Sequence, residues 1–461
     1  MNVLIYGLGR SGLAAARLAA SQGHQVETYD VRREGDDIEA ARALGATPLP
    51  SVDASEASIC IAAPGVPIDH PDLTRLRGMG VEVIGEVEWV YRTVPATYVG
   101  VTGTAGKGTV TRWIADTLAQ AGVDAVAGGN IDPALAAVAR PGATLVVELS
   151  SFQLERCPSL RPRVAVALNL GEDHIDRHGS VAAYHAAKRN IIRRQKAEDA
   201  FVYNADDPVL RTWLQGAAAR PLAFSLQGGA DATFDRARGL LTLGGDALLP
   251  AAELEVRGEH QIGNALAVAL ACRELGLPRD AIADGLRAFT GLPGRYAPAG
   301  NVGRVQFIED SIATRPLSVA AALKATPAPL VWIAGGRAKG ASIEALRPLV
   351  RGRVSLLVGV GEAGPIFARA FARDTDTLVC REQGGKDALA CAVRAALEHL
   401  RRHHDGAGHV LLAPLAASFD QFGDYVERAR VFREVVAAAA GDDEDLTRDA
   451  RSEGGPWTAC S

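Results

Sequence analysis

The chain has 461 residues, a formal net charge of −5 and 48% hydrophobic residues. The length predicts two to four domains, and the hydrophobic content is sufficient for a core in each. The negative net charge argues against a protein that binds nucleic acid through its phosphates. The sequence has no run of about 18 apolar residues, so we expect no membrane-spanning helix.

Glycine and alanine are abundant, whereas aromatic residues make up only 5% of the chain. This composition favours doubly wound α/β domains over β-sandwiches. The six cysteines form no Cys-x-x-Cys pair, which predicts reduced thiols in a cytoplasmic protein. The first residues carry no basic leader, so no signal peptide is expected.

The first predicted block covers residues 1–94. A strand over 3–6 runs into the glycine turn 7–12, a helix reaches Ala20, and a second strand ends at Asp30. This is the dinucleotide-binding arrangement, and alone it suggests a nicotinamide-dependent oxidoreductase. Because the turn and the helix N-terminus bind any diphosphate, a UDP-sugar fits equally well. A purely structural tight turn is the third interpretation.

The second block, residues 95–293, begins with an apolar strand that enters the glycine-rich segment 103–109. Backbone N–H groups in such a turn converge on phosphate oxygens, the ammonium group of Lys107 supplies positive charge, and the hydroxyl of Thr109 can hold Mg²⁺. The match to the common phosphate-loop pattern is imperfect, because Val101 stands where its first glycine falls and the hydroxyl comes one place late. We expect ATP binding, with a plain glycine-rich turn as the alternative.

Polar side chains follow two further strands of this block. Glu148 ends an apolar strand, where a carboxylate can reach a nucleotide-bound metal or merely cap a helix. The strand over 164–168 leads into segment 169–179, whose two histidines and three acids can ligate Mg²⁺ or form a solvated loop. Lys188 lies four residues after Tyr184 on a predicted helix and by itself suggests a surface lysine.

The third block, residues 294–440, alternates apolar segments with alanine-rich helical stretches. Its predicted strands are 305–308, 330–334, 354–358 and 409–413. The sequence thus predicts an α/β fold of three domains: a Rossmann-like N-terminal domain, a central P-loop ATPase-like domain with a parallel sheet, and a Rossmann-like C-terminal domain. Residues 441–461 are polar and are expected to be disordered.

Several motifs, in this order and spacing, resemble the Mur ligase family over essentially the whole chain. They are residues 103–109, 148–155, 173–176 with 184–188, and 258–264. Segments 292–295, 310–311 and 414–422 are similar to the branch that adds glutamate to UDP-N-acetylmuramoyl-L-alanine. The resemblance implies ATP-dependent amide ligation in peptidoglycan precursor synthesis: the substrate carboxylate becomes an acyl phosphate, an amine attacks it, and ADP and phosphate leave.

The resemblance also implies roles for individual residues. ATP would be bound by Gly103, Thr104, Ala105, Gly106, Lys107, Gly108, Thr109, Asn264, Arg295 and Asp310. The UDP-linked substrate would occupy the first glycine turn in place of NAD, through Leu8, Arg10, Ser11, Asp30, Arg32, Gly65, Asn130 and Ser151. The incoming glutamate would contact Thr314, Lys339, Ser418 and Phe422.

The same resemblance implies two Mg²⁺ sites. Their ligands would be Thr109, Glu148, His174 and Lys188, with Lys188 carbamylated and therefore anionic. Lys107, Lys188 and His174 are the expected catalytic residues. The chain is expected to be a cytoplasmic monomer that acts on small molecules, without nucleic acid.

Two positions depart from the family pattern. Ile312 stands where glutamate-adding ligases usually carry lysine, and Asp132 stands where they usually carry glycine. Because a branch that attaches L-glutamate varies in this region, D-glutamate is the expectation and L-glutamate the alternative.

Three other functions compete with this interpretation. An NAD-dependent oxidoreductase explains residues 7–30 but gives segment 103–109 and Lys188 no role. A regulatory nucleotide-binding protein without catalysis is suggested by Ile312. A folate polyglutamylating enzyme shares the phosphate loop, but it is not expected to carry the N-terminal block.

Overall fold

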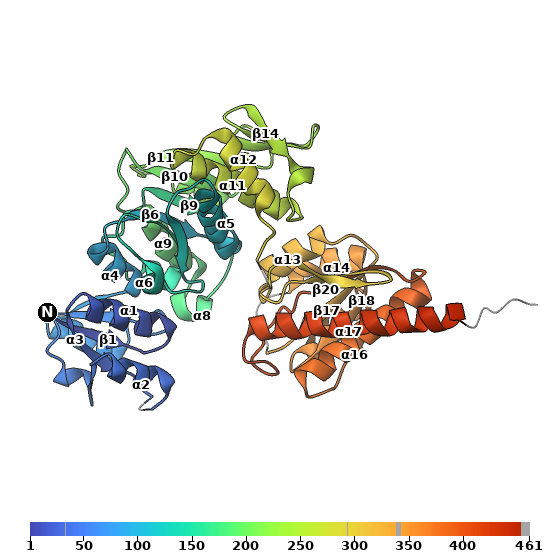
Figure 1. Cartoon of the computed structure of the whole chain (residues 1–461), viewed down its shortest axis with the longest axis horizontal. Helices are drawn as coiled ribbons and strands as arrows, with labels where there is room; N and C mark the ends of the chain where they lie inside the picture. The colour runs from blue at the N-terminus through green and yellow to red at the C-terminus, as the bar shows by residue number, and fades with distance from the viewer. Residues whose placement is uncertain (33, 293, 338–342, 453–461) are drawn as a thin grey trace, which may run out of the picture. The chain divides into compact units, whose positions relative to one another are not determined.

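The computed structural model describes residues 1–32, 34–292, 294–337 and 343–452, with side chains up to residue 441. The chain folds into two compact units. The first comprises Met1–Glu255 with Gln261–Phe289, and the second comprises Val256–His260 with Thr290–Ser461. Two sheets, of five and nine strands, lie in the first unit, and a six-stranded sheet lies in the second. The predicted α/β fold class is confirmed (Figure 1).

The N-terminal sheet is entirely parallel, with strand order β3-β2-β1-β4-β5. Its strands are β1 (Asn2–Tyr6), β2 (Gln25–Tyr29), β3 (Thr47–Pro48), β4 (Ile59–Ala62) and β5 (Glu82–Ile84). Its helices are α1 (Arg10–Ser21), α2 (Asp36–Ala43), η1 (Val52–Ala54), α3 (Pro71–Gly78) and α4 (Glu86–Thr93). Val3, Leu4 and Ile5 are fully buried, which explains why the central strand is continuously apolar.

The turn after β1 requires glycine at two positions. Gly7 has a φ of +91° and donates its N–H to the carbonyl of Tyr29 at 2.8 Å. A Cβ atom at Gly12 would lie 1.9 Å from the carbonyl oxygen of Gly7. The glycine turn is therefore fixed by close backbone packing as well as by any ligand.

The central sheet has the order β14-β13-β12-β11-β10-β9-β6-β8-β7. Its strands are β6 (Thr97–Thr102), β7 (Ala125–Gly129), β8 (Thr144–Glu148), β9 (Val164–Ala167), β10 (Ala200–Asn204), β11 (Arg220–Ser225), β12 (Ala232–Asp235), β13 (Leu240–Leu243) and β14 (Asp246–Pro250). Its helices are α5 (Lys107–Gln120), α6 (Leu135–Val138), α7 (Ser151–Leu154), α8 (Ile175–His178), α9 (Val181–Arg189), η2 (Asn190–Ile192), α10 (Pro208–Thr212), η3 (Ala251–Glu253), α11 (Glu259–Glu274) and α12 (Arg279–Ala288).

The predicted parallel sheet ends in an antiparallel extension. β12 pairs with β13, and β13 with β14, in antiparallel register. Gly244 and Gly245 have φ values of +65° and +90° between these last two strands, as a two-residue hairpin requires. The extension was not predicted, because its short strands lack a long apolar run.

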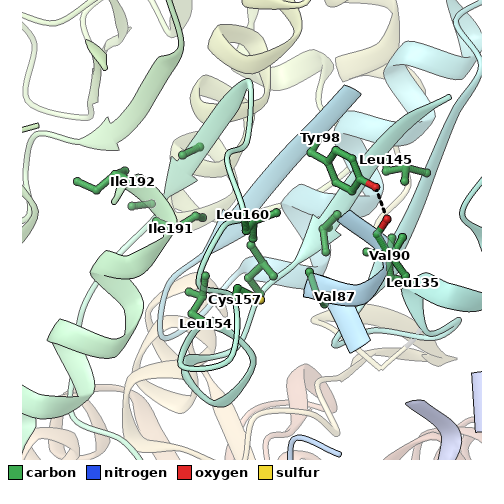
Figure 2. Packing of buried hydrophobic residues seen from close by; sticks show 14 of the residues in the cluster. Val87, Val90, Tyr98, Leu135, Leu145, Leu154, Cys157, Leu160, Ile191 and Ile192 are labelled. Carbon is green, nitrogen blue, oxygen red and sulfur yellow. Dashed lines mark hydrogen bonds between the residues drawn. The ribbon is translucent and has the colours of Figure 1, made fainter. Parts of the chain in front are cut away.

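Helix α4 joins the N-terminal block to the central core. Figure 2 shows its residues Val87 and Val90 packed with Leu135 and Leu145 of the central region. The hydroxyl of Tyr98, on β6, donates to the carbonyl of Val90 at 3.0 Å. This shared core explains why the first two sheets form one compact unit.

The six-stranded sheet has the order β15-β16-β20-β17-β18-β19, parallel except for the β15/β16 pair. Its strands are β15 (Ala297–Val302), β16 (Arg304–Glu309), β17 (Leu330–Gly335), β18 (Val354–Val360), β19 (Asp376–Val379) and β20 (Ala407–Leu412). Its helices are α13 (Pro316–Ala325), η4 (Glu344–Leu346), α14 (Arg347–Arg353), α15 (Gly364–Phe371), α16 (Gly385–His403) and α17 (Tyr425–Ser452). Helices α16 and α17 pack side by side (Figure 1).

One predicted boundary touches a residue that the structure does not describe, and another lies inside a helix. The boundary between the second and third blocks falls at Pro293. The tail expected to be disordered begins at residue 441, but α17 continues to Ser452, and the sequence over 441–452 contains no proline to interrupt a helix. The remaining tail, 453–461, lies outside the described residues.

The prediction of six reduced cysteines is wrong for one pair. Cys380 and Cys391 form a disulfide with a Cα–Cα distance of 6.1 Å. Their separation of 11 residues spans the turn from β19 into α16, which brings the two side chains together. Cys60, Cys157 and Cys272 are buried free thiols. Among the described helices, none is both long and apolar enough to cross a membrane.

Candidate active site

The phosphate loop lies between β6 and α5. Gly103 and Gly106 have φ values of +148° and +83°. Residues other than glycine rarely adopt such positive φ values. Helix α5 begins at Lys107 without a capping side chain. Because the first N–H groups of a helix have no partner inside it, this end attracts anions. The loop thus has the backbone of a phosphate site.

Asn169, two residues after the neighbouring strand β9, forms hydrogen bonds with the phosphate loop. Its carbonyl accepts the N–H of Thr104 at 2.9 Å, and its Oδ1 accepts the N–H of Ala105 at 2.8 Å. A Cβ atom at Gly106 would lie 3.0 Å from Oδ1 of Asn264. Asn264, one of the predicted ATP residues, therefore lies directly against the phosphate loop.

Two lysines converge on the loop from inside the first unit. The Nζ atom of Lys107 donates to the carbonyls of Gly103 and Thr104, at 3.0 and 3.1 Å. Lys188 is 1% exposed, and its Nζ donates to the same carbonyl of Gly103 at 2.9 Å. The structure thus places Lys188 at the phosphate loop and not at the surface.

Glu148 supplies a carboxylate beside the loop, because β8 pairs with β6 and aligns Glu148 with Val101. The side chain is buried, and its Oε1 accepts the side-chain N–H of Asn130 at 2.8 Å. Its Oε2 is also buried but accepts no hydrogen bond. A buried carboxylate oxygen without a donor fits a cation ligand. Thr109, another predicted ligand, is buried in the first turn of α5.

His174 and Tyr184 complete this cluster. His174 adopts a φ of +52°, and its Nε2 lies 3.3 Å from Oδ2 of Asp173. Its ring centroid lies 6.5 Å from that of Tyr184, whose hydroxyl is 3.2 Å from the hydroxyl of Thr104. Lys188 Nζ lies 4.8 Å above the Tyr184 ring. Tyr184 thus links both predicted ligands to the phosphate loop.

The first glycine turn is organised by Asp30. Its carboxylate accepts the N–H of Leu8 at 2.7 Å and the backbone N–H of Arg32 at 2.9 Å. Burial raises the pKa of Asp30, but hydrogen bonds from Arg32 and Leu8 outweigh it, so the pKa lies below its ordinary value. The carboxylate is therefore anionic and fixes the turn, as a hydroxyl-accepting acid does in nucleotide sites.

Glu86 was not predicted, although it connects two segments of the proposed substrate site. Its carboxylate accepts the hydroxyl of Ser11 at 2.9 Å and the N–H of Ala136 at 2.6 Å. Burial raises its pKa to about 7. Nearby, Nη1 of Arg10 lies 3.6 Å from a carboxylate oxygen of Asp132. The departure at Asp132 thus places an acid beside a predicted substrate-binding arginine.

Two arginines of the central block hold the turn that contains Gly65. Arg177 donates to the carbonyls of Gly65 and Val66, at 3.2 and 2.8 Å. Arg156 donates to the carbonyl of Ala63 at 3.0 Å. Neither arginine was predicted, because their acceptors are backbone atoms about a hundred residues away in sequence, which no side-chain motif reveals.

Ser151 contacts His178, another residue that the sequence did not single out by itself. His178 Nε2 lies 3.0 Å from Oγ of Ser151, and Nδ1 lies 3.2 Å from Oε1 of Glu155. The His178 side chain is 2% exposed. The structure therefore places Ser151 in a buried hydrogen-bonded group.

The remaining predicted residues belong to the second unit. Thr314 follows β16 and Ser418 follows β20, and because these strands are parallel neighbours, both residues lie at one edge of the sheet. The carbonyl of Ser418 accepts the N–H of Phe422 at 2.9 Å. A Cβ atom at Gly385 would lie 2.5 Å from the Phe422 ring. Lys339 lies outside the described residues.

Asp310 and Arg295 also lie in the second unit, apart in sequence from the other predicted ATP residues. Burial, followed by the charge of Glu309, raises the pKa of Asp310 to about 8. Arg428, which was not predicted, is buried behind this strand end and donates to the carbonyl of Ser311 at 2.7 Å. Burial lowers its pKa to about 10. Such perturbed groups at a strand end are typical of functional sites.

Two family models match the chain. The Mur ligase MurD-like N-terminal domain matches residues 1–85, and the Mur ligase middle domain matches residues 101–272. A Thermus thermophilus protein is 42% identical over 461 residues, covering 99% of both chains. A Deinococcus radiodurans protein is 43% identical over 447 residues, covering 95% of this chain and 93% of its own. Both carry the name UDP-N-acetylmuramoylalanine--D-glutamate ligase.

Solved structures of several ligases share the fold. MurF from Acinetobacter baumannii has a TM-score of 0.61 at 16% identity, with 90% of each chain covered. UDP-N-acetylmuramate-alanine ligase MurC from Thermotoga maritima has a TM-score of 0.59 at 20% identity, covering 95% of this chain and 100% of its own. MurF from Thermotoga maritima, in complex with ADP, has a TM-score of 0.58 at 16% identity, covering 92% of this chain and 96% of its own.

Proposed function

The chain belongs to the Mur ligase family, and from this we propose that it joins D-glutamate to UDP-N-acetylmuramoyl-L-alanine with consumption of ATP. The observation that carries the proposal is the position of Lys188, buried against the phosphate-loop carbonyl of Gly103. Full-length relatives named for D-glutamate ligation support the choice of substrate. They leave an NAD-dependent oxidoreductase, a folate enzyme and a non-catalytic regulator without support.

The proposed reaction has two steps on one substrate carboxylate. The carboxylate of the alanyl group attacks the γ-phosphorus of ATP, the bond to the bridging oxygen breaks, and ADP leaves. The glutamate amine then attacks the acyl phosphate, loses a proton and displaces phosphate. Lys107 and the backbone N–H groups at the start of α5 would neutralise the charge on the transferring phosphoryl group.

Two Mg²⁺ ions fit the residues around the loop. Thr109 would hold the ion on the nucleotide phosphates, and Glu148, His174 and carbamylated Lys188 would hold the second. Bound Mg²⁺ supplies charge neutralisation on the phosphoryl oxygens. The buried Oε2 of Glu148, which accepts no hydrogen bond, supports this arrangement. Carbamylation adds CO₂ to the neutral amine of Lys188 with release of a proton, and it turns a cation into an anionic ligand.

The first glycine turn would bind the uridine diphosphate portion of the substrate. The N–H groups at the start of α1 suit a diphosphate, and Asp30 is held as a carboxylate by Leu8 and Arg32. Thr314, Ser418 and Phe422 would receive glutamate at the edge of the C-terminal sheet, with Lys339 as a further contact. Because ATP is made and used in the cytoplasm, we propose a cytoplasmic protein, and we propose that it acts as a monomer.

The test offers UDP-N-acetylmuramoyl-L-alanine, ATP and Mg²⁺ with either D- or L-glutamate. We expect phosphate release only when the UDP-linked substrate and D-glutamate are both present, and mass spectrometry should show the glutamyl product. Product formation with L-glutamate but not with D-glutamate would assign the chain to the alternative branch. Phosphate release that depends on neither substrate would contradict ligation. Titration with NADH, followed by absorbance, should show no turnover.

A further inference from the structure

His178 is a buried histidine that the proposed reaction does not use. It ends α8, and its ring packs between two other elements: its centroid lies 5.4 Å from that of Phe152 in α7 and 5.5 Å from that of Tyr184 in α9. Its side chain is only 2% exposed. A polar ring buried this far needs partners for both nitrogens, and both partners lie on or beside α7.

The two partners define the tautomer of His178. Nδ1 lies 3.2 Å from the carboxylate of Glu155, which only accepts hydrogen bonds, so Nδ1 carries the proton. In the neutral ring Nε2 is then an acceptor, and it accepts a hydrogen bond from the hydroxyl of Ser151 at 3.0 Å. Burial and the positive charges of Arg177 and Lys188 lower the pKa of His178, against the opposing carboxylates of Glu155 and Asp173. We call Ser151, His178 and Glu155 the histidine clamp.

The histidine clamp holds both ends of α7, a helix too short to be stable by its own hydrogen bonds. α7 has four residues, and the side chain of Ser150 forms a capping box with Gln153 at its start. So short a helix has few internal hydrogen bonds. His178 ties the first residue of α7, Ser151, to Glu155 just beyond its end. Because Glu148 precedes Ser151 by three residues, the clamp also restrains the strand end that carries the proposed metal-binding carboxylate.

On its other side the clamp reaches the phosphate loop. His178 contacts the ring of Tyr184, whose hydroxyl meets that of Thr104 at 3.2 Å and whose face lies 4.8 Å from Nζ of Lys188. The ring of His178 therefore lies between the segment that carries Glu148 and the helix that carries Lys188.

We propose that His178 is a positioning residue that fixes the spacing between Glu148 and Lys188, and so sets the affinity of the second divalent cation site. This rests on the proposed function, since it takes those two residues as metal ligands. His178 acts through its contacts with Ser151, Glu155 and Tyr184 and is not itself one of the proposed metal ligands. Outer partners that orient ligands typically change metal affinity by about 10- to 100-fold when they are removed.

The test measures Mn²⁺ binding to the full chain with ADP and bicarbonate, by electron paramagnetic resonance of the free ion. His178→Phe keeps an aromatic ring but loses both hydrogen bonds, and we expect Mn²⁺ to bind about tenfold more weakly. Ser151→Ala should shift the affinity in the same direction, and the double variant should be no weaker than His178→Phe, because both remove one connection. His24→Phe, in which the native ring packs on Trp89 of α4, is the matched control and should bind as the wild type does.

The possible outcomes distinguish a specific effect of the histidine clamp on cation affinity from a general loss of stability and from failure of the proposed function. Unchanged Mn²⁺ affinity in His178→Phe, or additive effects in the double variant, would overturn the proposal. If His178→Phe does not fold, Ser151→Ala decides, since it removes one hydroxyl, and wild-type affinity in that variant overturns the clamp. Melting temperatures recorded alongside identify a merely structural loss, which would leave the Mn²⁺ affinity of the folded fraction unchanged. Failure of the wild type to ligate glutamate would count against the proposed function. The difference in Mn²⁺ affinity between the wild type and the variants tests the histidine clamp separately.

Discussion

The ammonium groups of Lys107 and Lys188 donate to one acceptor, the carbonyl oxygen of Gly103, at 3.0 and 2.9 Å. Two cations that share one oxygen repel each other, and the buried one gains little from solvent. If Lys188 is carbamylated, it becomes an anion, and this repulsion becomes attraction. We therefore predict different effects for substitution of Lys107, which neutralises phosphate charge, and of Lys188, which would carry the carbamate.

Lys107→Ala should abolish phosphate release and leave binding of the UDP-linked substrate nearly unchanged. The ammonium group lies at the phosphate loop, whereas the proposed uridine site is on the N-terminal sheet. Phosphate release and calorimetric titration with UDP-N-acetylmuramoyl-L-alanine measure the two effects separately. Lys196→Ala, which changes an exposed lysine of the same unit, should behave as the wild type does. Loss of both phosphate release and binding of the UDP-linked substrate in Lys107→Ala would contradict the assignment of the two sites.

Lys188→Ala should be inactive and should regain partial activity with formate or acetate. These small carboxylates fit the space left by the side chain and replace the anionic oxygens of a carbamate. Phosphate release measured over a range of acetate concentrations tests this. Lys188→Arg, which fills the space and stays cationic, should not respond to acetate. Equal responses of the two variants would count against a carbamate.

Glu86 should make the stability of the first unit depend on pH. Its pKa is about 7 in the folded protein, above the ordinary value of 4.5 for glutamate, so the folded state retains a proton that the unfolded state loses between these values. The free energy of unfolding should therefore fall as the pH rises through this window, by about 3 kcal/mol.

Glu86→Gln cannot ionise and should lack this decrease. Denaturant unfolding of both proteins at about pH 5 and about pH 8 gives the difference that Glu86 contributes. The wild type should lose stability relative to the variant at the higher pH. A difference between the two proteins that stays constant with pH would show that Glu86 titrates normally.

Reduction of the Cys380–Cys391 disulfide should destabilise the second unit by about 2–3 kcal/mol, because the bond closes a short loop in the unfolded chain. It should also raise the KM for glutamate, since Gln421 donates to the carbonyls of Glu382 and Gln383 inside that loop, at 3.2 and 3.3 Å. Unfolding and kinetics with and without a phosphine reductant measure both effects. Cys380→Ser should match the reduced wild type and show no response to reductant, and a response in that variant would identify another target.

The sequence predicted the parts of the site that are local in the chain. Segment 103–109 has its own turn chemistry, and the α/β alternation follows from apolar periodicity. Lys188 is the instructive case: its sequence context suggests a surface lysine, and only the family resemblance singled it out. Its burial depends on the carbonyl of Gly103, 85 residues away, which no local pattern encodes.

The features that were missed depend on long-range pairing or on backbone acceptors. Glu86 accepts hydrogen bonds from Ser11 and Ala136, which are 75 and 50 residues away in sequence. The sequence alone does not show whether a glutamate is buried or exposed. The disulfide was missed because the cysteines lack a motif and meet only through the turn from β19 into α16. The antiparallel extension was missed because its short strands depend on neighbouring strands for their burial.

The unequal surroundings of the two carboxylate oxygens of Glu148 bear on which metal the protein selects. Oε1 accepts a hydrogen bond from Asn130, whereas the buried Oε2 accepts none, so Oε2 is the oxygen better placed to bind an ion. A carboxylate limited to one oxygen disfavours Ca²⁺, whose large coordination shell often takes both oxygens, and suits Mg²⁺, which binds carboxylates singly in a tight octahedron. In the proposed metal site, the hydrogen bond from Asn130 would therefore favour single-oxygen coordination by Glu148.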